Sequence, residues 1–205
     1  MMPAADFTIY LASKSARRRD LLDQVGVAHR AIELSEGPDG DVDESEQAGE
    51  APADYVLRLA RVKALAGWRK MNQQNFSPRP LLAADTTVAL NGAILGKPES
   101  PAHAVDMLRS LSGTTHLVHT AVAVIWQDHV ECTLSSTEVR FRRLEEQELL
   151  RYVATSEPLD KAGGYGIQGQ AAAFVECLDG SHSGVVGLPL FETLALLKKF
   201  GVNIP

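Results

Sequence analysis

Apolar and polar positions along this chain repeat with two different periods. Short apolar runs rich in β-branched and aromatic residues predict strands, and they cover residues 7–12, 28–34, 116–126, 130–141 and 171–178. Apolar residues at helical spacing predict amphipathic helices, and they cover residues 17–25, 53–71, 101–112, 145–154 and 188–200. Pro101 and Gly113 mark the start and the stop of one such helix, because proline suits the first helical position and glycine follows the last.

Residues 83–98 predict a β-hairpin. Two apolar runs flank Asn91-Gly92, a dipeptide that favours a type I′ turn because both central residues need a positive φ. A two-residue loop fixes the register, which continues along the strands to Thr86 opposite Lys97. The open end of the hairpin then brings Asp85, Thr86 and Lys97 within reach of one another.

This open end allows two interpretations. A carboxylate such as Asp85 can hold a divalent cation or activate water, and a lysine such as Lys97 can hold a phosphate. Strict alternation puts these two side chains on opposite faces, so a shared site requires a bend or a bulge at this end. The alternative is a surface hairpin that ends in a solvated charge pair.

The loop after the first predicted strand has the composition of an anion site. Two hydroxyl groups and three guanidinium groups crowd this loop and the first helical turn: Ser13, Ser15, Arg17, Arg18 and Arg19. A strand, a small-residue loop and a helix start present backbone N–H groups to an anion. Three arginines oppose the helix dipole here, a cost that makes sense where an anion binds. The alternative is a solvated basic turn, and the glycine and lysine pattern of a P-loop is missing.

An acidic segment and a lysine follow. Residues 35–54 contain eight acidic and no basic residues, interrupted by glycines and prolines, which predicts a mobile loop with mostly solvated carboxylates. Asp43-Glu44 is the exception if the loop folds back over a metal ion. Lys63 lies beside the apolar stripe of the next helix, where it either extends to water or points into a cleft and meets phosphate.

Residues 157–169 form a second unusual stretch, with four glycines within seven residues around Tyr165 and Gln168. Such a loop lets backbone approach a ligand closely. The Gln168 amide offers both a donor and an acceptor, which suits the edge of a nucleobase. The alternative is a tight structural loop.

The whole chain has 205 residues, ordinary globular composition and a net charge of −6. That charge argues against a protein that coats nucleic acid or an anionic membrane. The N-terminus lacks the pattern of a signal peptide, and no apolar run approaches the length of a membrane span. We therefore expect a soluble, cytoplasmic protein with no nucleic-acid or membrane partner.

The sequence predicts no metal site built from histidines or cysteines. His116 and His119 are three residues apart in a predicted strand, so they face opposite ways and are expected to be polar surface residues. Cys132 and Cys177 lack paired metal spacing, and each is expected to be a small buried hydrophobe.

Five stretches resemble one family in this order, and the match extends from about residue 11 to residue 197. They are Leu11-Ala12-Ser13-Lys14-Ser15-Ala16-Arg17-Arg18; Asp43-Glu44 with Arg58-Leu59-Ala60-Arg61-Val62-Lys63-Ala64; Ala84-Asp85-Thr86 with Gly96-Lys97-Pro98; Asp160-Lys161-Ala162-Gly163-Gly164-Tyr165-Gly166-Ile167-Gln168-Gly169; and Gly180-Ser181 with Val185-Val186-Gly187-Leu188-Pro189-Leu190. Together they resemble the Maf (septum formation) family of nucleoside triphosphate pyrophosphatases.

The resemblance implies an α/β fold similar to inosine triphosphate pyrophosphatases. The expected structure is a single domain over residues 1–205, with a mixed, bent β-sheet, flanking helices and two lobes around a central cleft. The implied activity is cleavage of a nucleoside triphosphate to the monophosphate and pyrophosphate with Mg²⁺ or Mn²⁺. The resemblance also implies a homodimer.

The same resemblance assigns roles to individual residues. Asp85 would accept a proton from water and, with Glu44, would hold the metal. The implied phosphate-binding residues are Ser13, Arg18, Lys63 and Lys97. The implied residues for base choice are Arg17, Thr86 and Gln168.

The form of the glycine-rich loop is similar to the branch that acts on dTTP and UTP, whereas the branch acting on 7-methyl-GTP has a different loop. Gln168 can bond the O4/N3–H edge that uracil and thymine share, and a pocket that uses this edge would reject cytosine. Lys14 and Gly184 depart from the usual family residues, glycine and asparagine. A nucleotide-binding regulator of cell division without catalysis is the alternative class.

Overall fold

The computed structural model describes residues 8–35 and 41–204. Residue 7 of the first predicted strand and residues 36–40 of the acidic segment lie outside the described residues. Seven strands form one mixed sheet: β1 (Ile9–Ala12), β2 (His29–Ala31), β3 (Leu81–Leu90), β4 (Ala93–Leu95), β5 (Thr115–Trp126), β6 (His129–Phe141) and β7 (Val175–Asp179). Their order is β2-β1-β3-β5-β6-β7, with β4 paired to β3. β1 is parallel to β2 and β3, whereas the other pairs are antiparallel.

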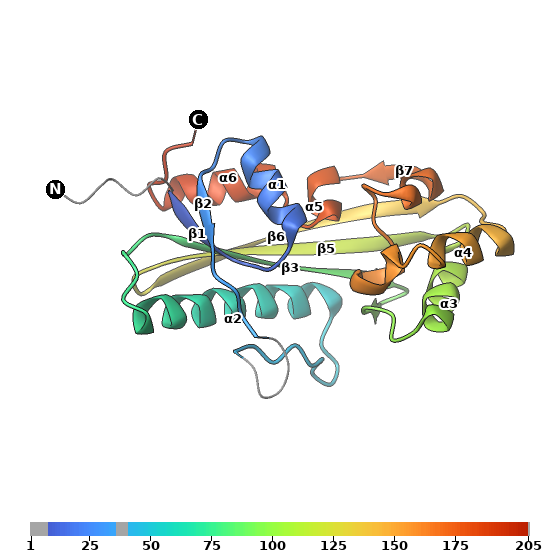
Figure 1. Cartoon of the computed structure of the whole chain (residues 1–205), viewed down its shortest axis with the longest axis horizontal. Coiled ribbons are helices and arrows are strands. Elements are labelled where there is room, and N and C mark those ends of the chain that lie inside the picture. Colours follow the sequence, from blue (N-terminus) through green and yellow to red (C-terminus); the bar gives the residue numbers. More distant parts are fainter. Residues whose placement is uncertain (1–7, 36–40, 205) are drawn as a thin grey trace.

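Helices cover both faces of this sheet (Figure 1). They are α1 (Ala16–Gln24), α2 (Pro52–Gln73), α3 (Pro101–Leu111), α4 (Glu146–Val153), α5 (His182–Val186) and α6 (Leu190–Lys199). Three 3₁₀ helices, η1 (Glu157–Asp160), η2 (Ala162–Gly164) and η3 (Gln170–Phe174), lie between α4 and β7. Within the described ranges, no helix combines the length and the apolar character needed to cross a membrane.

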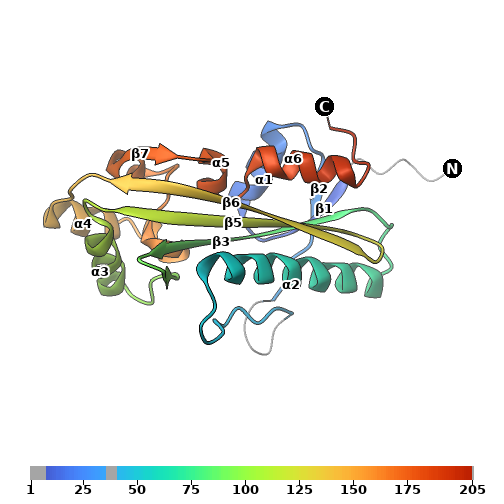
Figure 2. The same cartoon turned by 180° about the vertical axis from the view of Figure 1, so that it is seen from behind.

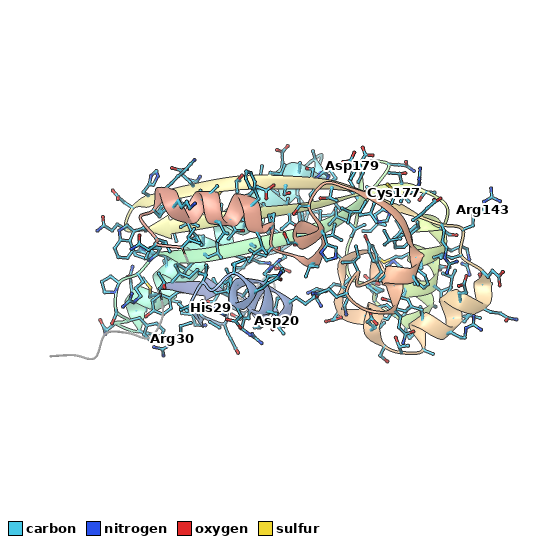
Figure 3. All side chains as sticks on the ribbon, turned by 90° about the horizontal axis from the view of Figure 1, so that it is seen from above. Asp20, His29, Arg30, Arg143, Cys177 and Asp179 are labelled. Atoms are coloured by element: carbon cyan, nitrogen blue, oxygen red, sulfur yellow. The ribbon has the colours of Figure 1, made fainter. Side chains whose placement is uncertain are left out.

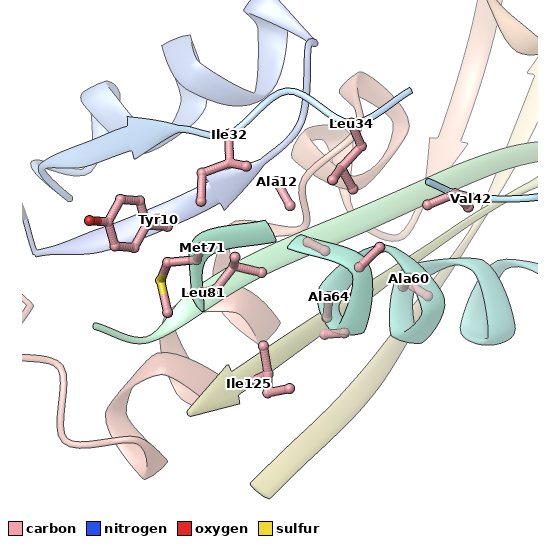
Figure 4. Close-up of a cluster of buried hydrophobic side chains, with 14 of the residues drawn as sticks. Tyr10, Ala12, Ile32, Leu34, Val42, Ala60, Ala64, Met71, Leu81 and Ile125 are labelled. Atoms are coloured by element: carbon pink, nitrogen blue, oxygen red, sulfur yellow. The ribbon is translucent and has the colours of Figure 1, made fainter. Parts of the chain in front are cut away.

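Alternation along the central strands divides the core into layers. Tyr10 and Leu81 face α2, in a cluster that includes Met71 and Ile125 (Figure 4). The neighbouring side chains of β1 and β3 point to the opposite face, where they pack against α1 and α6. Burial on both faces explains why these strands are nearly continuous apolar runs.

The long strands β3, β5 and β6 join two lobes. Seen from either side, α1, α2, α6, β1 and β2 gather at one end of these strands, and α3, α4 and β7 gather at the other (Figures 1 and 2). A separate apolar cluster under α3 and α4 forms the core of the second lobe. The structure therefore has the mixed sheet and the two lobes expected from the sequence.

The predicted hairpin is confirmed at its turn and corrected at its open end. Asn91 and Gly92 both have positive φ, and Leu90 pairs with Ala93. The β3–β4 ladder ends at Val88 opposite Leu95, so the predicted pairing of Thr86 with Lys97 does not form. Thr86 pairs instead with Thr120 of β5.

The last predicted strand starts later than expected. Residues 170–174 are the 3₁₀ helix η3, and β7 begins at Val175. Ala171 and Phe174 are both buried, and residues three apart share one face of a 3₁₀ helix but opposite faces of a strand. Burial of this pair therefore favours the helical turn. Residues 182–186, for which the hydrophobic pattern predicts no helix, form the short helix α5.

The histidine and cysteine expectations are wrong about burial. His116 and His119 are 2% and 7% exposed, and they form hydrogen bonds with the Tyr165 hydroxyl at 2.7 Å and the Ser136 hydroxyl at 2.8 Å. A hydroxyl partner lets a histidine lie in the core. Cys132 is half-buried and Cys177 is exposed on β7, at the far end of the molecule from Arg30 (Figure 3).

Burial of His116 predicts a pH-dependent stability. Burial lowers the pKa of His116 from 6.5 to about 4. As the pH falls, His116 takes up a proton in the unfolded chain before it does so in the folded protein. The contribution of neutral His116 to the free energy of unfolding is therefore fully present above pH 6.5 and is lost progressively down to about pH 4. We expect a loss of about 3 kcal/mol from this group across the window. Denaturant unfolding at a series of pH values should show a shallower decline for His116→Gln than for the wild type, and equal declines would contradict this.

Candidate functional site

A cleft of about 720 Å³ opens between the two lobes. Every site residue expected from the sequence lines it: Ser13, Arg17, Arg18, Glu44, Lys63, Asp85, Thr86, Lys97 and Gln168. The fold therefore brings together side chains from the start of α1, the acidic segment, α2, β3, the end of the hairpin and the glycine-rich loop.

The edge of β3 explains how neighbouring residues of one strand reach the same cleft. β1 pairs with β3 only as far as Ala83, and β4 begins to pair at Val88. Between Ala83 and Val88, no strand of the described residues pairs with this edge of β3. Asp85 faces the α2 side, Thr86 faces the α1 side, and the cleft reaches both across the open edge.

Lys97 needs no distortion of the strand to join them. β3 keeps an unbroken register with β5 from Leu81 to Ala89, so the bulge considered from the sequence does not occur there. Lys97 lies beyond the end of β4, where strand alternation no longer applies. An exposed lysine in the loop after the ladder can therefore line the same cleft as Asp85.

Lys63 lies at the centre of the site. Its Nζ is 2.6 Å from Asp85 Oδ1 and 2.5 Å from Glu44 Oε1, and the residue is only 8% exposed. The alternative in which Lys63 extends to water is therefore wrong. α2 presents Lys63 on the same face as Val56, Leu59 and Ala60, which pack on the sheet.

Burial and charge shift the pKa values of this ion pair. Burial alone would lower the pKa of Lys63, but the Asp85 and Glu44 carboxylates outweigh it and raise that pKa. Burial raises the pKa of Asp85, Glu44 adds to the rise, and Lys63 and Arg18 oppose it. Lys63 therefore stays protonated, and Asp85 is a stronger proton acceptor than an exposed aspartate.

Glu44 reaches Lys63 because the acidic segment is fastened along α2. The Tyr55 hydroxyl donates to the Glu44 carbonyl oxygen at 2.9 Å. Arg58 donates to both oxygens of Glu50 at 2.6 and 2.7 Å and to the Ser45 carbonyl at 3.0 Å. The acidic segment therefore folds back over the cleft and places the Glu44 carboxylate against Lys63, while Glu50 is paired with Arg58 and is not solvated either.

Arg18 is held by three separate segments of the chain. Its Nε–H donates to the Gly187 carbonyl at 2.8 Å, Nη1 to Ser13 Oγ at 3.3 Å, and Nη2 to Thr86 Oγ1 at 3.2 Å. Ser15 caps α1 by accepting from the Arg18 backbone N–H. These contacts aim a fixed cation at the cleft, whereas the sequence alone also allowed a solvated basic turn.

The remaining candidates lie nearer the mouth. Arg17 Nη1 is 3.8 Å from Asp160 Oδ2, a contact that joins α1 to η1. Gln168 is exposed in the glycine-rich loop. Gly163 in that loop has φ +70°, and a Cβ there would lie 2.9 Å from Val88 Cγ2, so the loop packs closely against β3.

Two contributing residues escaped the sequence interpretation. Thr120 Oγ1 lies 3.0 Å from Thr86 Oγ1 and 2.8 Å from the Gly184 carbonyl oxygen, so it orients Thr86. A threonine in a β-branched strand carries no signal of such a role. Tyr55 looks like an ordinary helix residue in the sequence, although it fixes the Glu44 backbone.

The donors suit a divalent cation such as Mg²⁺. Residues 8–35 and 41–204 contain no cluster of three His, Cys, Asp or Glu side chains that could hold a metal. Mg²⁺, however, is usually bound by one or two carboxylates together with substrate phosphate oxygens. Asp85 and Glu44 converge on one point, the Lys63 Nζ, at 2.6 and 2.5 Å. Two carboxylates and a triphosphate would therefore fit such an ion.

Comparisons with known proteins agree with this geometry. A dTTP/UTP pyrophosphatase of Nitrosomonas europaea is 50% identical over 206 residues, which is 100% of both chains. One of Bordetella avium is 52% identical over 197 residues, 96% of this chain and 97% of that protein. The structure of the Staphylococcus aureus Ham1 protein has a TM-score of 0.51 at 15% identity and covers 94% of this chain and 98% of its own, which confirms the fold class. The family model described as Maf-like protein matches residues 8–200, and this chain therefore belongs to the Maf-like protein family.

Proposed function

We propose that this protein is a metal-dependent nucleoside triphosphate pyrophosphatase that cleaves dTTP and UTP to the monophosphate and pyrophosphate. The observation that carries the proposal is the contact of Lys63 with both Asp85 and Glu44, in a cleft that Arg18 and Lys97 also line. Relatives about half identical over nearly the whole chain are named dTTP/UTP pyrophosphatases. A net-negative protein needs such a local group of cations to hold a triphosphate.

Asp85 carries the proton in the proposed reaction. A water oxygen forms a bond to the α-phosphorus as the bond from that phosphorus to the bridging α–β oxygen breaks. One water proton passes to an Asp85 carboxylate oxygen, and the other stays on the oxygen that is now part of the monophosphate. The electron pair leaves with pyrophosphate, whose growing charge Lys63, Lys97 and Arg18 stabilise. Ser13 adds a hydroxyl to this phosphate-binding group.

Glu44 and Asp85 are the residues that we propose hold Mg²⁺ or Mn²⁺ together with the substrate. When bound, the ion supplies charge neutralisation at the phosphate oxygens. The fixed Arg18 guanidinium and the buried Lys63 ammonium provide charge that needs no rearrangement during the reaction.

Base choice is assigned to the residues at the mouth. Gln168 offers a donor and an acceptor to the O4/N3–H edge of uracil or thymine. Thr86, oriented by Thr120, and Arg17, opposite Asp160, complete this proposed group.

A panel of triphosphates tests the proposal. We expect pyrophosphate release from dTTP and UTP with Mg²⁺ or Mn²⁺, loss of release on chelation of the metal, and much slower release from CTP. Turnover of 7-methyl-GTP without turnover of dTTP or UTP would move the protein to the other branch of the family. Nucleotide binding seen by thermal shift, with no hydrolysis under either metal, would favour a non-catalytic regulator of cell division.

We further propose that the protein acts in the cytoplasm as a homodimer, which rests on family resemblance. Light scattering coupled to size-exclusion chromatography tests the oligomeric state, and a monomer at micromolar concentration would contradict it.

A further inference from the structure

Gln168 is the third residue of a tight turn. The Gly169 N–H donates to the Gly166 carbonyl at 3.0 Å, which closes a turn over residues 166–169. Gln168 lies at the apex of this turn, so the orientation of the turn decides where its side chain points. Contacts that hold Gly166 and Gly169 in place therefore also orient Gln168.

The Glu157 carboxylate fills the space beside both ends of this turn. A Cβ added at Gly169 would overlap the Glu157 carboxylate, and one at Gly166 would lie 2.8 Å from Lys161 Cε and 3.1 Å from Glu157 Oε1. The Gln170 N–H donates to Glu157 Oε2 at 3.4 Å. The missing side chain at Gly169 therefore makes room for a carboxylate that supports the turn from behind, and the one at Gly166 makes room for the Lys161 side chain and for that carboxylate.

Tyr152 fastens this carboxylate and the turn to α4. Its hydroxyl donates to Glu157 Oε1 at 3.1 Å and accepts the Gly166 N–H at 3.1 Å. The side chain is 2% exposed, and its ring packs edge-on against Phe174 at 5.2 Å. A single hydroxyl, fixed by the core of the second lobe, thus holds the start of the turn and its supporting carboxylate together.

A second set of contacts extends this network to the opposite wall of the cleft. Lys161 Nζ donates to the Glu157 carbonyl and to Asp160 Oδ1, both at 2.6 Å. Asp160 in turn faces Arg17. The segment that carries Glu157 therefore touches both Arg17 and the Gln168 turn.

We propose that Tyr152 and Glu157 are positioning residues that set base selectivity by holding the turn over residues 166–169 against α4. Neither side chain lines the cleft, so they act through Gln168. The inference rests on the proposed function, because it assumes that Gln168 meets the base.

Two conservative variants test it, Tyr152→Phe and Glu157→Gln. Each removes or weakens hydrogen bonds and keeps the side-chain shape. We expect kcat/KM for UTP to fall about tenfold, the effect of one lost hydrogen bond to a charged group, chiefly through a higher KM. Because CTP makes no use of the Gln168 edge, its kcat/KM should hardly change, and the UTP-to-CTP preference should fall about tenfold with it.

Two matched variants control for lost stability. Tyr10→Phe removes the hydroxyl of another buried tyrosine, on β1 and away from the turn. Glu148→Gln weakens the capping contacts of α4 and the bond to Arg142 without touching the turn. Both should lower the melting temperature and leave the UTP-to-CTP preference as in the wild type.

The outcomes separate this inference from the proposed function. A wild type that does not cleave UTP overturns the proposed function. A wild type that prefers UTP, with the same preference in folded Tyr152→Phe or Glu157→Gln, overturns only the positioning role. Should Tyr152→Phe fail to fold, Glu157→Gln decides the question alone, because Glu157 is partly exposed and its replacement keeps the same size.

Discussion

Asp85→Asn should lower kcat for dTTP and UTP about a thousandfold or more while the protein stays folded. An amide of the same shape cannot take the proton from water and is a poor ligand for a divalent cation. Lys63 keeps Glu44 as a partner at 2.5 Å, so the substitution does not leave its ammonium buried alone. Pyrophosphate release and the circular dichroism spectrum measure the two parts of this expectation.

Asp106→Asn is the matched control for this substitution. Asp106 is an exposed residue of α3, paired with Arg109, and its loss should leave kcat unchanged. An Asp85→Asn protein that retains more than about a tenth of the wild-type kcat would remove Asp85 as proton acceptor, because general base catalysis contributes at least about a hundredfold.

Lys63→Met should also cause a large loss of activity. Methionine keeps the apolar stem of the lysine, but it leaves two carboxylates, Asp85 and Glu44, without the cation that both contact. We expect kcat/KM to fall about a hundredfold or more, since the pyrophosphate leaving group loses a fixed positive charge. Stability should also fall, by about 3 kcal/mol, because a buried charge pair is broken on one side.

A lysine on the same helix provides the comparison. Lys70 lies two turns further along α2, is partly exposed, and contacts Asp41 at 3.3 Å. Lys70→Met should change stability by less than about 1 kcal/mol and leave kcat/KM intact. Equal losses of activity in the two variants would contradict a specific role for Lys63, because they would show that activity depends on the total charge of α2.

Local sequence determined the turns and helix starts that depend only on neighbouring residues. Asn91-Gly92 fixes the hairpin turn because both positions have positive φ, and Ser100 with Pro101 fixes the start of α3. Where a choice depended on a distant partner, the sequence was insufficient. Ala171 and Phe174 look like part of a strand until the core of the second lobe is known.

The same division holds for the site. Motifs spread along the chain pointed to nine of the residues that line the cleft, because glycine-rich loops and cations at a helix start stand out against ordinary composition. They could not show that Lys63 is buried between Asp85 and Glu44, nor that Thr120 orients Thr86. Those facts depend on which strands and helices become neighbours.

By itself, the sequence determined the hairpin turn, the five helices α1, α2, α3, α4 and α6, and the chemistry that the chain can offer, since these follow from the periodicity, turns and caps of adjacent residues. Only the tertiary structure decided that the ladder ends at Leu95 and that an open edge of β3 admits both Asp85 and Thr86 to one cleft. It also decided that His116 is buried against Tyr165. The physical reason is that burial and strand pairing depend on residues far apart in the chain, whose contacts no local pattern specifies.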